Sequence, residues 1–357
     1  GLLAGVLFRP LGAAAAWNMA VLTQIVLAAV VAWRMGRDLL ESSEASIVLT
    51  LTVTCSAPIL GFLHSGLGEN LGLAPATGLV WASIRAMGRD PRGRPPSPRA
   101  ALWMGGCLVL CTLQTPYYGV FGGLWLLCMF PGTGWRSRIR PLGIASTVAA
   151  IPVTLIAWTI QQSLSRSDAA IRAETAPGWS PSSLPATDLM SFLHPGPWYH
   201  PDTPALGNPG ILHISYIGLG ALLLLVCRFL WAPERRLGLG LPTLFFGLLC
   251  LGPVVSIQRW SPGVPLPMSL LFAVDIPLRG LHHPYRIIGM ALPLLGLWIA
   301  WVTTSLPRRF QLGIPVLLVA ETLYLSPAPW PLQTLDTRAP EIYASLPSGP
   351  VLDWPAD

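Results

Sequence analysis

The sequence predicts an all-α membrane protein, a polytopic transmembrane bundle of about ten helices with one long extracytoplasmic loop. Hydrophobic residues make up 52% of the chain and charged residues only 11%, whereas roughly a quarter of the residues in an ordinary soluble domain are charged. The apolar residues form long runs, and the basic residues lie between these runs. The net charge of +6 therefore indicates membrane topology, and we expect no nucleic-acid partner.

The expected helices are the apolar runs of about 20 residues, the length that crosses the hydrocarbon core of a bilayer. They lie at 12–33, 46–63, 70–87, 100–115, 117–131, 142–162, 212–231, 239–256, 287–305 and 310–327. The third run contains Pro75, which predicts an interrupted, partly re-entrant helix. The fourth and fifth are short and share the connection 115–118, which favours a hairpin that does not cross the membrane fully.

The segment 163–213 is dense in Pro, Ser, Trp and His and separates two apolar halves. Its unpaired backbone groups cannot lie in hydrocarbon, so we expect it in water or at the membrane surface, as the wall of a site. The chain then has four parts: a transmembrane half at 1–162, an extracytoplasmic loop at 163–212, a second transmembrane half at 213–327 and an extracytoplasmic tail at 328–357.

Arginine predicts the orientation, because short cytoplasmic connections of membrane proteins carry an excess of positive charge. Most of the 22 basic residues, all of them Arg, fall in five alternate connections. These contain Arg34 and Arg37; Arg85, Arg89, Arg92, Arg94 and Arg99; Arg136, Arg138 and Arg140; Arg228, Arg235 and Arg236; and Arg308 and Arg309. We therefore expect a multi-pass protein of the bacterial inner (cytoplasmic) membrane, with the long loop, the tail and any site on the outer side.

The first candidate site is the short outer connection 61–72 (GFLHSGLGENLG), which carries His64 and Glu69. A carboxylate and an imidazole in one tight turn can act as a general base. The Glu69 carboxylate is also a candidate ligand for a divalent cation, Mg²⁺ or Mn²⁺. The alternative is a Gly-rich turn whose polar side chains are only solvated.

The second candidate is the segment 274–289 (VDIPLRGLHHPYRIIG), which carries four potential donors to an anion. They are Arg279, His282, His283 and Arg286. Pro284 is suited to the first turn of the following helix, whose free N–H groups form an anion site. This pattern predicts a phosphate or pyrophosphate at the outer leaflet. The alternative is that the Arg side chains only extend toward lipid headgroups from a helix end.

Two further features lie on the same side. In DLMSFLHP, Asp188 and His194 are six residues apart on an expected short surface helix that ends at Pro195, and we take both as candidate substrate-binding residues. The neighbouring Trp and Tyr side chains are typical of membrane interfaces. Glu321 lies within the last apolar run, where an ionisable group is costly and by default suggests a functional role. The alternative is that it is hydrogen-bonded to a neighbouring helix or protonated, and we leave it out of the main site.

The order of these features resembles the GT-C superfamily of polytopic glycosyltransferases, particularly YfhO-like and related bacterial membrane proteins. The segments that carry the resemblance cover nearly the whole chain. They are LGAAAAWNMAVLTQIVLAAVVAWRMGRDL, APILGFLHSGLGENLGLAPATGLVWA, LQTPYYGVFGGLWLL, DLMSFLHPGPW, YIGLGALLLL, IPLRGLHHPYRIIGMALPLL and APEIYASLPSGPVLDWP.

The resemblance implies transfer of a sugar from a polyprenyl-phosphate carrier to a lipid, polymer or protein acceptor on the outer face. It also implies that this chain starts near residues 8–11 at the end of the first outer loop, as a fragment without the first helix and the catalytic Asp of that loop. Glu69 with His64 would then be the remaining acidic site, and Arg279 and Arg286 would bind the carrier phosphate.

Two other classes compete with an enzyme: a lipid or glycolipid transporter or flippase, and a non-catalytic membrane assembly protein. A transporter is expected to have repeated halves and polar groups near the bilayer midplane, but the sequence has no clear internal repeat and its polar residues gather at one face. The motifs GxxxxGK[ST], GxSxG and HExxH are absent from the sequence, which argues against a cytoplasmic ATPase or a soluble hydrolase.

Overall fold

A computed structural model describes most of the two apolar halves of the chain. The described residues are 8–11, 13–64, 71, 73–130, 135–166, 187–193, 216–231, 240–257, 260, 262–273 and 284–324. The regular structure of this part is helical, and its only β contacts are two isolated bridges, Val254 with Pro265 and Ile257 with Trp260. The all-α prediction is confirmed for the described chain.

Each of the expected apolar runs contains at least one helix. The first half comprises η1 (Arg9–Leu11), α2 (Ala13–Leu40), α3 (Ser43–Cys55), α4 (Ala57–His64), α5 (Leu73–Ala86), α6 (Pro98–Gln114), α7 (Pro116–Met129) and α8 (Trp135–Arg166). The second half comprises η4 (Leu189–Phe192), α10 (Leu219–Trp231), α11 (Gly240–Cys250), α12 (Pro267–Ala273), η7 (Pro284–Ile287), α13 (Ile288–Thr304) and α14 (Arg308–Tyr324).

Three helical stretches in the described residues are long and apolar enough to cross a membrane. They are Ala14–Leu40, Ser43–Leu63 and Arg136–Thr159. The other helices are shorter: α13 has 17 residues, which at 1.5 Å per residue gives about 26 Å, somewhat less than the roughly 30 Å of a hydrocarbon core. The described helices are therefore compatible with a membrane protein.

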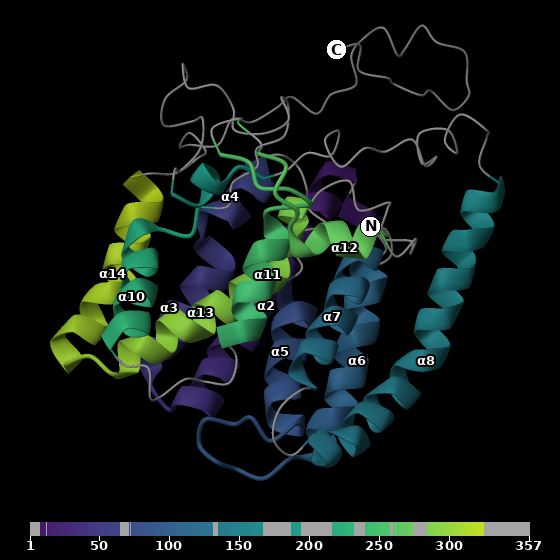
Figure 1. The fold of residues 1–357 in the computed structure, drawn as a ribbon, viewed down its shortest axis with the longest axis horizontal. Helices are drawn as coiled ribbons and strands as arrows, with labels where there is room; N and C mark the ends of the chain where they lie inside the picture. Colours follow the sequence, from purple (N-terminus) through teal and green to yellow (C-terminus); the bar gives the residue numbers. More distant parts are fainter. Residues whose placement is uncertain are drawn as a thin grey trace, which may run out of the picture.

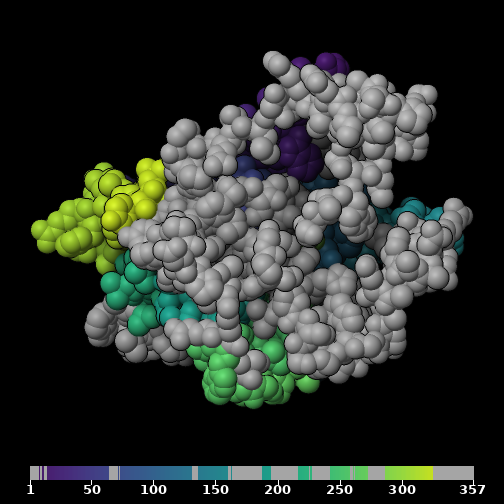
Figure 2. Space-filling model, turned by 90° about the horizontal axis from the view of Figure 1, so that it is seen from above, coloured from purple at the N-terminus to yellow at the C-terminus, as the bar shows by residue number. Residues whose placement is uncertain are grey.

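Helix α13 lies at the centre of the bundle. Its side chains are buried along nearly the whole length, and it packs against α3, α5, α10 and α11. On one side α10 and α14 form the edge of the molecule, and on the other side α8 packs on α6 and forms the opposite edge (Figure 1). The end view places α14 and α8 on opposite sides as well (Figure 2).

The local sequence explains where α5, α6 and α7 begin. Helix α5 starts at Leu73, so Pro75 lies in the first turn, where a missing N–H loses no intrahelical bond; the expected interruption is absent between residues 73 and 86. The Ser97 side chain accepts a hydrogen bond from the Ala100 N–H and caps α6. Pro116 starts α7 directly after Thr115, and α6 packs against α7, which confirms the predicted hairpin.

In the described residues, four arginine-rich connections meet at one end of the bundle, which we call the Arg-rich end; the charges of Arg37 and Arg308 both act on Glu44 there. Arg92 donates a hydrogen bond to the Asp38 carbonyl across the first two connections. Arg89 and Arg138 are close enough for their charges to interact. In Figure 1 the connection between α5 and α6 and the start of α8 lie at the bottom, while α8 and α14 end at the top. The gathering of arginine predicted from the sequence is therefore present.

Candidate functional site

The structure describes only part of the first predicted cluster, the segment 61–72. Helix α4 ends at His64, and α4 lies at the end of the bundle opposite the Arg-rich end (Figure 1). The side chain of His64 and the whole of Glu69 lie outside the described residues. No group of three or more His, Cys, Asp or Glu residues in the described ranges is arranged to hold a metal ion. The role of Glu69 as a cation ligand stays a prediction.

Arg286 is the described member of the second cluster, and it lies on the turn that leads into the central helix. Pro284 opens η7, which runs directly into α13, as predicted for a proline at a helix start. The Arg286 guanidinium carbon lies 5.2 Å from the centroid of the Tyr117 ring, within the range of a cation–π interaction. Arg279, His282 and His283 lie outside the described residues.

The position of this turn is fixed by tight packing between α13 and α7. Ile287 and Ile288 are buried, and η7 contacts both α7 and α11. A Cβ atom at Gly289 would overlap the side chain of Tyr118, so only glycine allows the two helices to approach this closely. Arg286 and Tyr117 are thus held together by the residues next to each of them in sequence.

Asp188, from the third candidate, has a structural role in its own segment. Its Oδ1 atom accepts a 2.9 Å hydrogen bond from the Met190 N–H and caps the 3-10 turn η4, which is the short helix predicted there. The residue is only 3% exposed. The N–H groups of Thr187 and Leu189 bond to the carbonyls of Leu251 and Ser256. His194 lies outside the described residues.

These contacts bring two predicted site segments to one helix. The Asp188 segment is bonded to Leu251, directly after the C-terminal end of α11, and the Arg286 turn packs against α11 as well. The two segments are almost one hundred positions apart in the sequence. The structure therefore brings the Asp188 segment and the Arg286 turn to the same helix, while Glu69, His194, His282 and His283 lie outside the described residues.

Glu321 is hydrogen-bonded to a neighbouring helix, which is one of the alternatives that the sequence leaves open. Its carboxylate accepts hydrogen bonds from the Tyr216 hydroxyl (2.5 Å) and from the N–H groups of Leu219 (2.5 Å) and Gly220 (3.2 Å). These N–H groups belong to the first turn of α10, where an anion is favourable. Glu321 therefore joins α14 to the start of α10 and is a structural residue.

Sequence reasoning missed an ion-pair network at the Arg-rich end. The Asp90 side chain is 1% exposed and forms ion pairs with Arg85 and, at 2.6 Å, with Arg94. The Asp38 carboxylate pairs with Arg94 at 2.6 Å and accepts a hydrogen bond from the Trp81 indole N–H at 2.8 Å. Two carboxylates and two guanidinium groups thus join α2, α5 and the connection that follows α5.

The electrostatics of this end follow from these contacts. Burial favours a lower pKa for the Arg94 guanidinium, but its hydrogen bonds to Asp38 and Asp90 outweigh this effect and raise the pKa. Burial lowers the pKa of Arg89, and the charge of Arg138 lowers it further. Asp38 and Asp90 therefore offset part of the positive charge that the sequence concentrates here.

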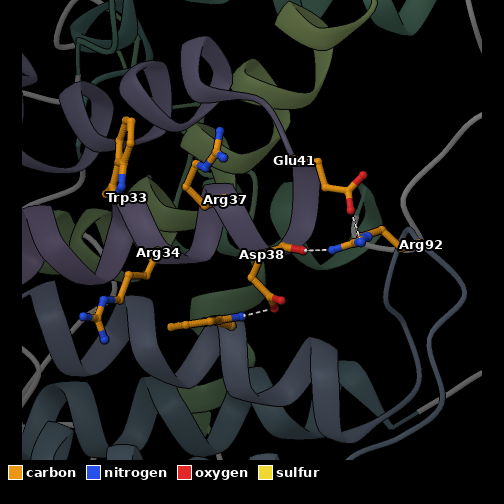
Figure 3. A pocket seen from close by; sticks show the side chains of 7 residues that line it. Trp33, Arg34, Arg37, Asp38, Glu41 and Arg92 are labelled. Carbon is orange, nitrogen blue, oxygen red and sulfur yellow. Dashed lines mark hydrogen bonds and ion pairs between the residues drawn. The ribbon is translucent and has the colours of Figure 1, made fainter.

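A pocket opens beside this network, along the last turns of α2. It has a volume of about 720 Å³ and is lined by Trp33, Arg34, Arg37, Asp38, Glu41, Trp81 and Arg92. Figure 3 shows Trp33 and Arg37 on one side of α2 and Arg34 on the other, and Asp38 accepts hydrogen bonds from both Trp81 and Arg92. Arg92 is paired with Glu41. The pocket combines aromatic rings with arginine, a composition suited to an anionic, amphipathic ligand.

Comparisons with known proteins identify no relative: no family model, no curated protein and no solved structure matches the chain.

Proposed function

We propose that the protein is a membrane glycosyltransferase of the GT-C type, which takes a sugar from a polyprenyl-phosphate carrier on the outer face of the bacterial cytoplasmic membrane. The acceptor is a lipid, a polymer or a protein. The observation that carries the proposal is Arg286, held over the Tyr117 ring at the start of the central helix α13. This arrangement fits a phosphate group of a lipid carrier.

The chemistry of this corner supports a phosphate ligand in two ways. Stacking on an aromatic ring orients the planar guanidinium, whose N–H groups bind phosphate oxygens in a fixed geometry. The turn that bears Arg286 leads into the N-terminus of α13, and a helix N-terminus favours negative charge. Arg279, His282 and His283 are the proposed further donors to the phosphate.

The orientation follows from the Arg-rich end, which we assign to the cytoplasm by the positive-inside rule. Arg286 and His64 then lie toward the outer side, as do the segments 163–212 and 328–357. In this proposal the ten apolar runs make up the membrane bundle, with the fourth and fifth as a hairpin that does not cross the membrane fully.

The proposed reaction breaks the bond between the anomeric carbon and the carrier phosphate and forms a bond from that carbon to the acceptor oxygen. Glu69, assisted by His64, takes the proton of the acceptor hydroxyl. The released polyprenyl phosphate carries the negative charge, which Arg279 and Arg286 stabilise. A divalent cation at Glu69 would supply further charge stabilisation when bound. Asp188 and His194 are proposed to form the acceptor side of the site.

Binding of polyprenyl phosphate to the purified protein tests this proposal. Loss of a charged hydrogen bond costs about 1.5–3 kcal/mol, so we expect Arg286→Ala to weaken binding roughly 10- to 100-fold. The matched control is Arg309→Ala, since Arg309 lies 5.0 Å from the centroid of the Phe310 ring but belongs to the Arg-rich end. Native mass spectrometry in detergent measures the affinity of both variants for polyprenyl phosphate. Equal affinity of Arg286→Ala and the unsubstituted protein, or equal loss in both variants, would contradict the assignment.

A further inference from the structure

Helix α2 exposes an apolar stripe that leads into the pocket at the Arg-rich end. Its exposed residues at helical spacing are Met19, Leu22, Val26, Val30 and Trp33. The steps of three and four residues keep these side chains on one face of the helix. Arg37 follows Trp33 by four residues and continues the same face, and Arg34 flanks it. An apolar surface about four turns long thus ends in a pair of arginines.

The other face of α2 is packed inside the protein. Ala28, Ala32, Met35 and Leu39 are buried, and α2 packs on α3 and α5. The exposed stripe is therefore the side of α2 that would face lipid. Trp33 stands between the apolar stripe and the arginines, the position in which tryptophan is favoured at a membrane interface.

The pocket keeps positive charge for a ligand although it contains two carboxylates. Asp38 is paired with Arg85 and Arg94, and Glu41 is paired with Arg92. Arg37 donates a hydrogen bond to the Ser43 hydroxyl, which is uncharged. Arg34 is exposed and forms no ion pair with any described residue. Neither Arg34 nor Arg37 forms an ion pair with a carboxylate that lines the pocket, and the charge of Arg37 also acts on the neighbouring Glu44.

We propose that this pocket binds the phosphate headgroup of an anionic phospholipid, whose acyl chains lie along the exposed stripe of α2. Arg37, which lies on the same side of α2 as Trp33, is the proposed contact to the phosphate, while Arg34 projects from the other side of the helix and adds positive charge at the same end (Figure 3). The rings of Trp33 and Trp81, which line the pocket, are proposed to contact the glycerol region. The site is separate from the Arg286 corner and does not depend on the proposed transferase activity.

The ionic network gives the site a rigid base. Arg92 and Arg94 both donate to the Asp38 carbonyl, at 2.9 and 2.8 Å, so the last turn of α2 is fixed to the connection after α5. The Trp81 ring is held by its bond to Asp38. A headgroup that binds here therefore meets side chains whose positions are already set, which lowers the entropic cost of binding.

Lipid selectivity of the full chain tests the inference. The protein is reconstituted into phosphatidylcholine membranes that contain spin-labelled phosphatidylglycerol or spin-labelled phosphatidylcholine, and the relative association of the two labelled lipids is measured. We expect a preference for phosphatidylglycerol that falls about tenfold in the Arg34→Gln/Arg37→Gln variant, since arginines at the surface attract anionic lipid. The matched control is Arg99→Gln/Arg140→Gln, which removes two exposed arginines at the same end but outside the pocket. We expect it to change the preference less than twofold.

Two outcomes would overturn the inference. An equal loss in both double variants would mean that general surface charge attracts the lipid. Displacement of labelled phosphatidylglycerol by the same concentration of inorganic phosphate would mean that the pocket takes free phosphate instead of a lipid headgroup. Circular dichroism and size-exclusion profiles like those of the unsubstituted protein establish that the variants are folded, and all four arginines are exposed, so their replacement should not disturb the core.

Discussion

Asp90 is the residue around which the Arg-rich end is built. Its carboxylate pairs with Arg85 and Arg94 and accepts a 2.9 Å hydrogen bond from the N–H of Arg92. A buried carboxylate is tolerated only when its oxygens are paired and hydrogen-bonded. The removal of its charge would leave the partly buried guanidinium groups of Arg85 and Arg94 with Asp38 as their remaining carboxylate partner.

We expect Asp90→Asn to lower the free energy of unfolding by about 2 kcal/mol. This is less than the 3–5 kcal/mol typical of a broken, fully buried pair, because Arg85 and Arg94 are 21% and 26% exposed. Thermal unfolding in detergent measures the change. The control is Glu41→Gln, whose side chain is 61% exposed and whose ion pair should contribute less than about 1 kcal/mol. Equal melting temperatures of the two variants would refute this account of Asp90.

At the residue scale, the sequence predicted which positions carry charge but not how they pair. Asp38 and Trp81 are 43 positions apart, and no local pattern joins them. Arg85, Arg92 and Arg94 indicate topology when they are taken from the sequence alone, while in the structure they also hold two connections together. The Asp188 segment was predicted as a short helix, but its capping role depends on hydrogen-bond geometry that the sequence does not contain.

At the scale of elements, close helix contacts depend on particular glycines. In α7, a Cβ atom at Gly119 would overlap Thr112 of α6, whereas one at Gly123 would meet no atom within 4 Å. The spacing of these two glycines predicts a close helix contact through both of them. In the structure only Gly119 makes it, because α7 turns Gly123 away from packed neighbours.

These two positions give a paired test within one helix. We expect Gly119→Ala to destabilise the protein by about 1–3 kcal/mol through overpacking. Gly123→Ala should be neutral or stabilise it by up to about 1 kcal/mol, because alanine has the higher helix propensity. The apparent Tm values of the two variants, measured in the same detergent, test this prediction. A larger loss for Gly123→Ala than for Gly119→Ala would show that the α6–α7 packing is not as described.

The positions of the helices were predictable because apolar runs and their ends are local signals. Thr115 and Pro116 mark the end of one helix and the start of the next, and together they were sufficient to predict the hairpin. The predicted effect of Pro75 was wrong. Helix α5 starts at Leu73, whose side chain is buried in the core, and this start places the proline in the first turn.

At the scale of the whole molecule, the Arg-rich end is the main topological feature. The prediction that follows is that this end faces the cytoplasm. Leu193 and Arg99 are exposed positions at the two ends of the bundle, and single cysteines placed there can be compared in a chain whose six native cysteines are replaced by alanine.

We expect a membrane-impermeant maleimide to label Leu193→Cys in intact cells and to label Arg99→Cys only after permeabilisation. Protection of Arg99→Cys arises because the reagent cannot cross the membrane. Labelling of Arg99→Cys in intact cells together with protection of Leu193→Cys would reverse the orientation and, with it, the assignment of Arg286 to the outer face.

We propose that the outer end of the bundle transfers a sugar from a polyprenyl-phosphate carrier, and turnover of the sugar donor is the measurement that tests this proposal. Release of polyprenyl phosphate from a radiolabelled polyprenyl-phosphate sugar is measured in membranes that contain the full-length protein and a mixed pool of cell-envelope acceptors. We expect release by the unsubstituted protein, a loss of at least about 100-fold in Glu69→Gln as expected for a missing general base, and unchanged binding of the carrier in that variant. The proposal would be refuted if Glu69→Gln released polyprenyl phosphate at the rate of the unsubstituted protein, or if the unsubstituted protein released none.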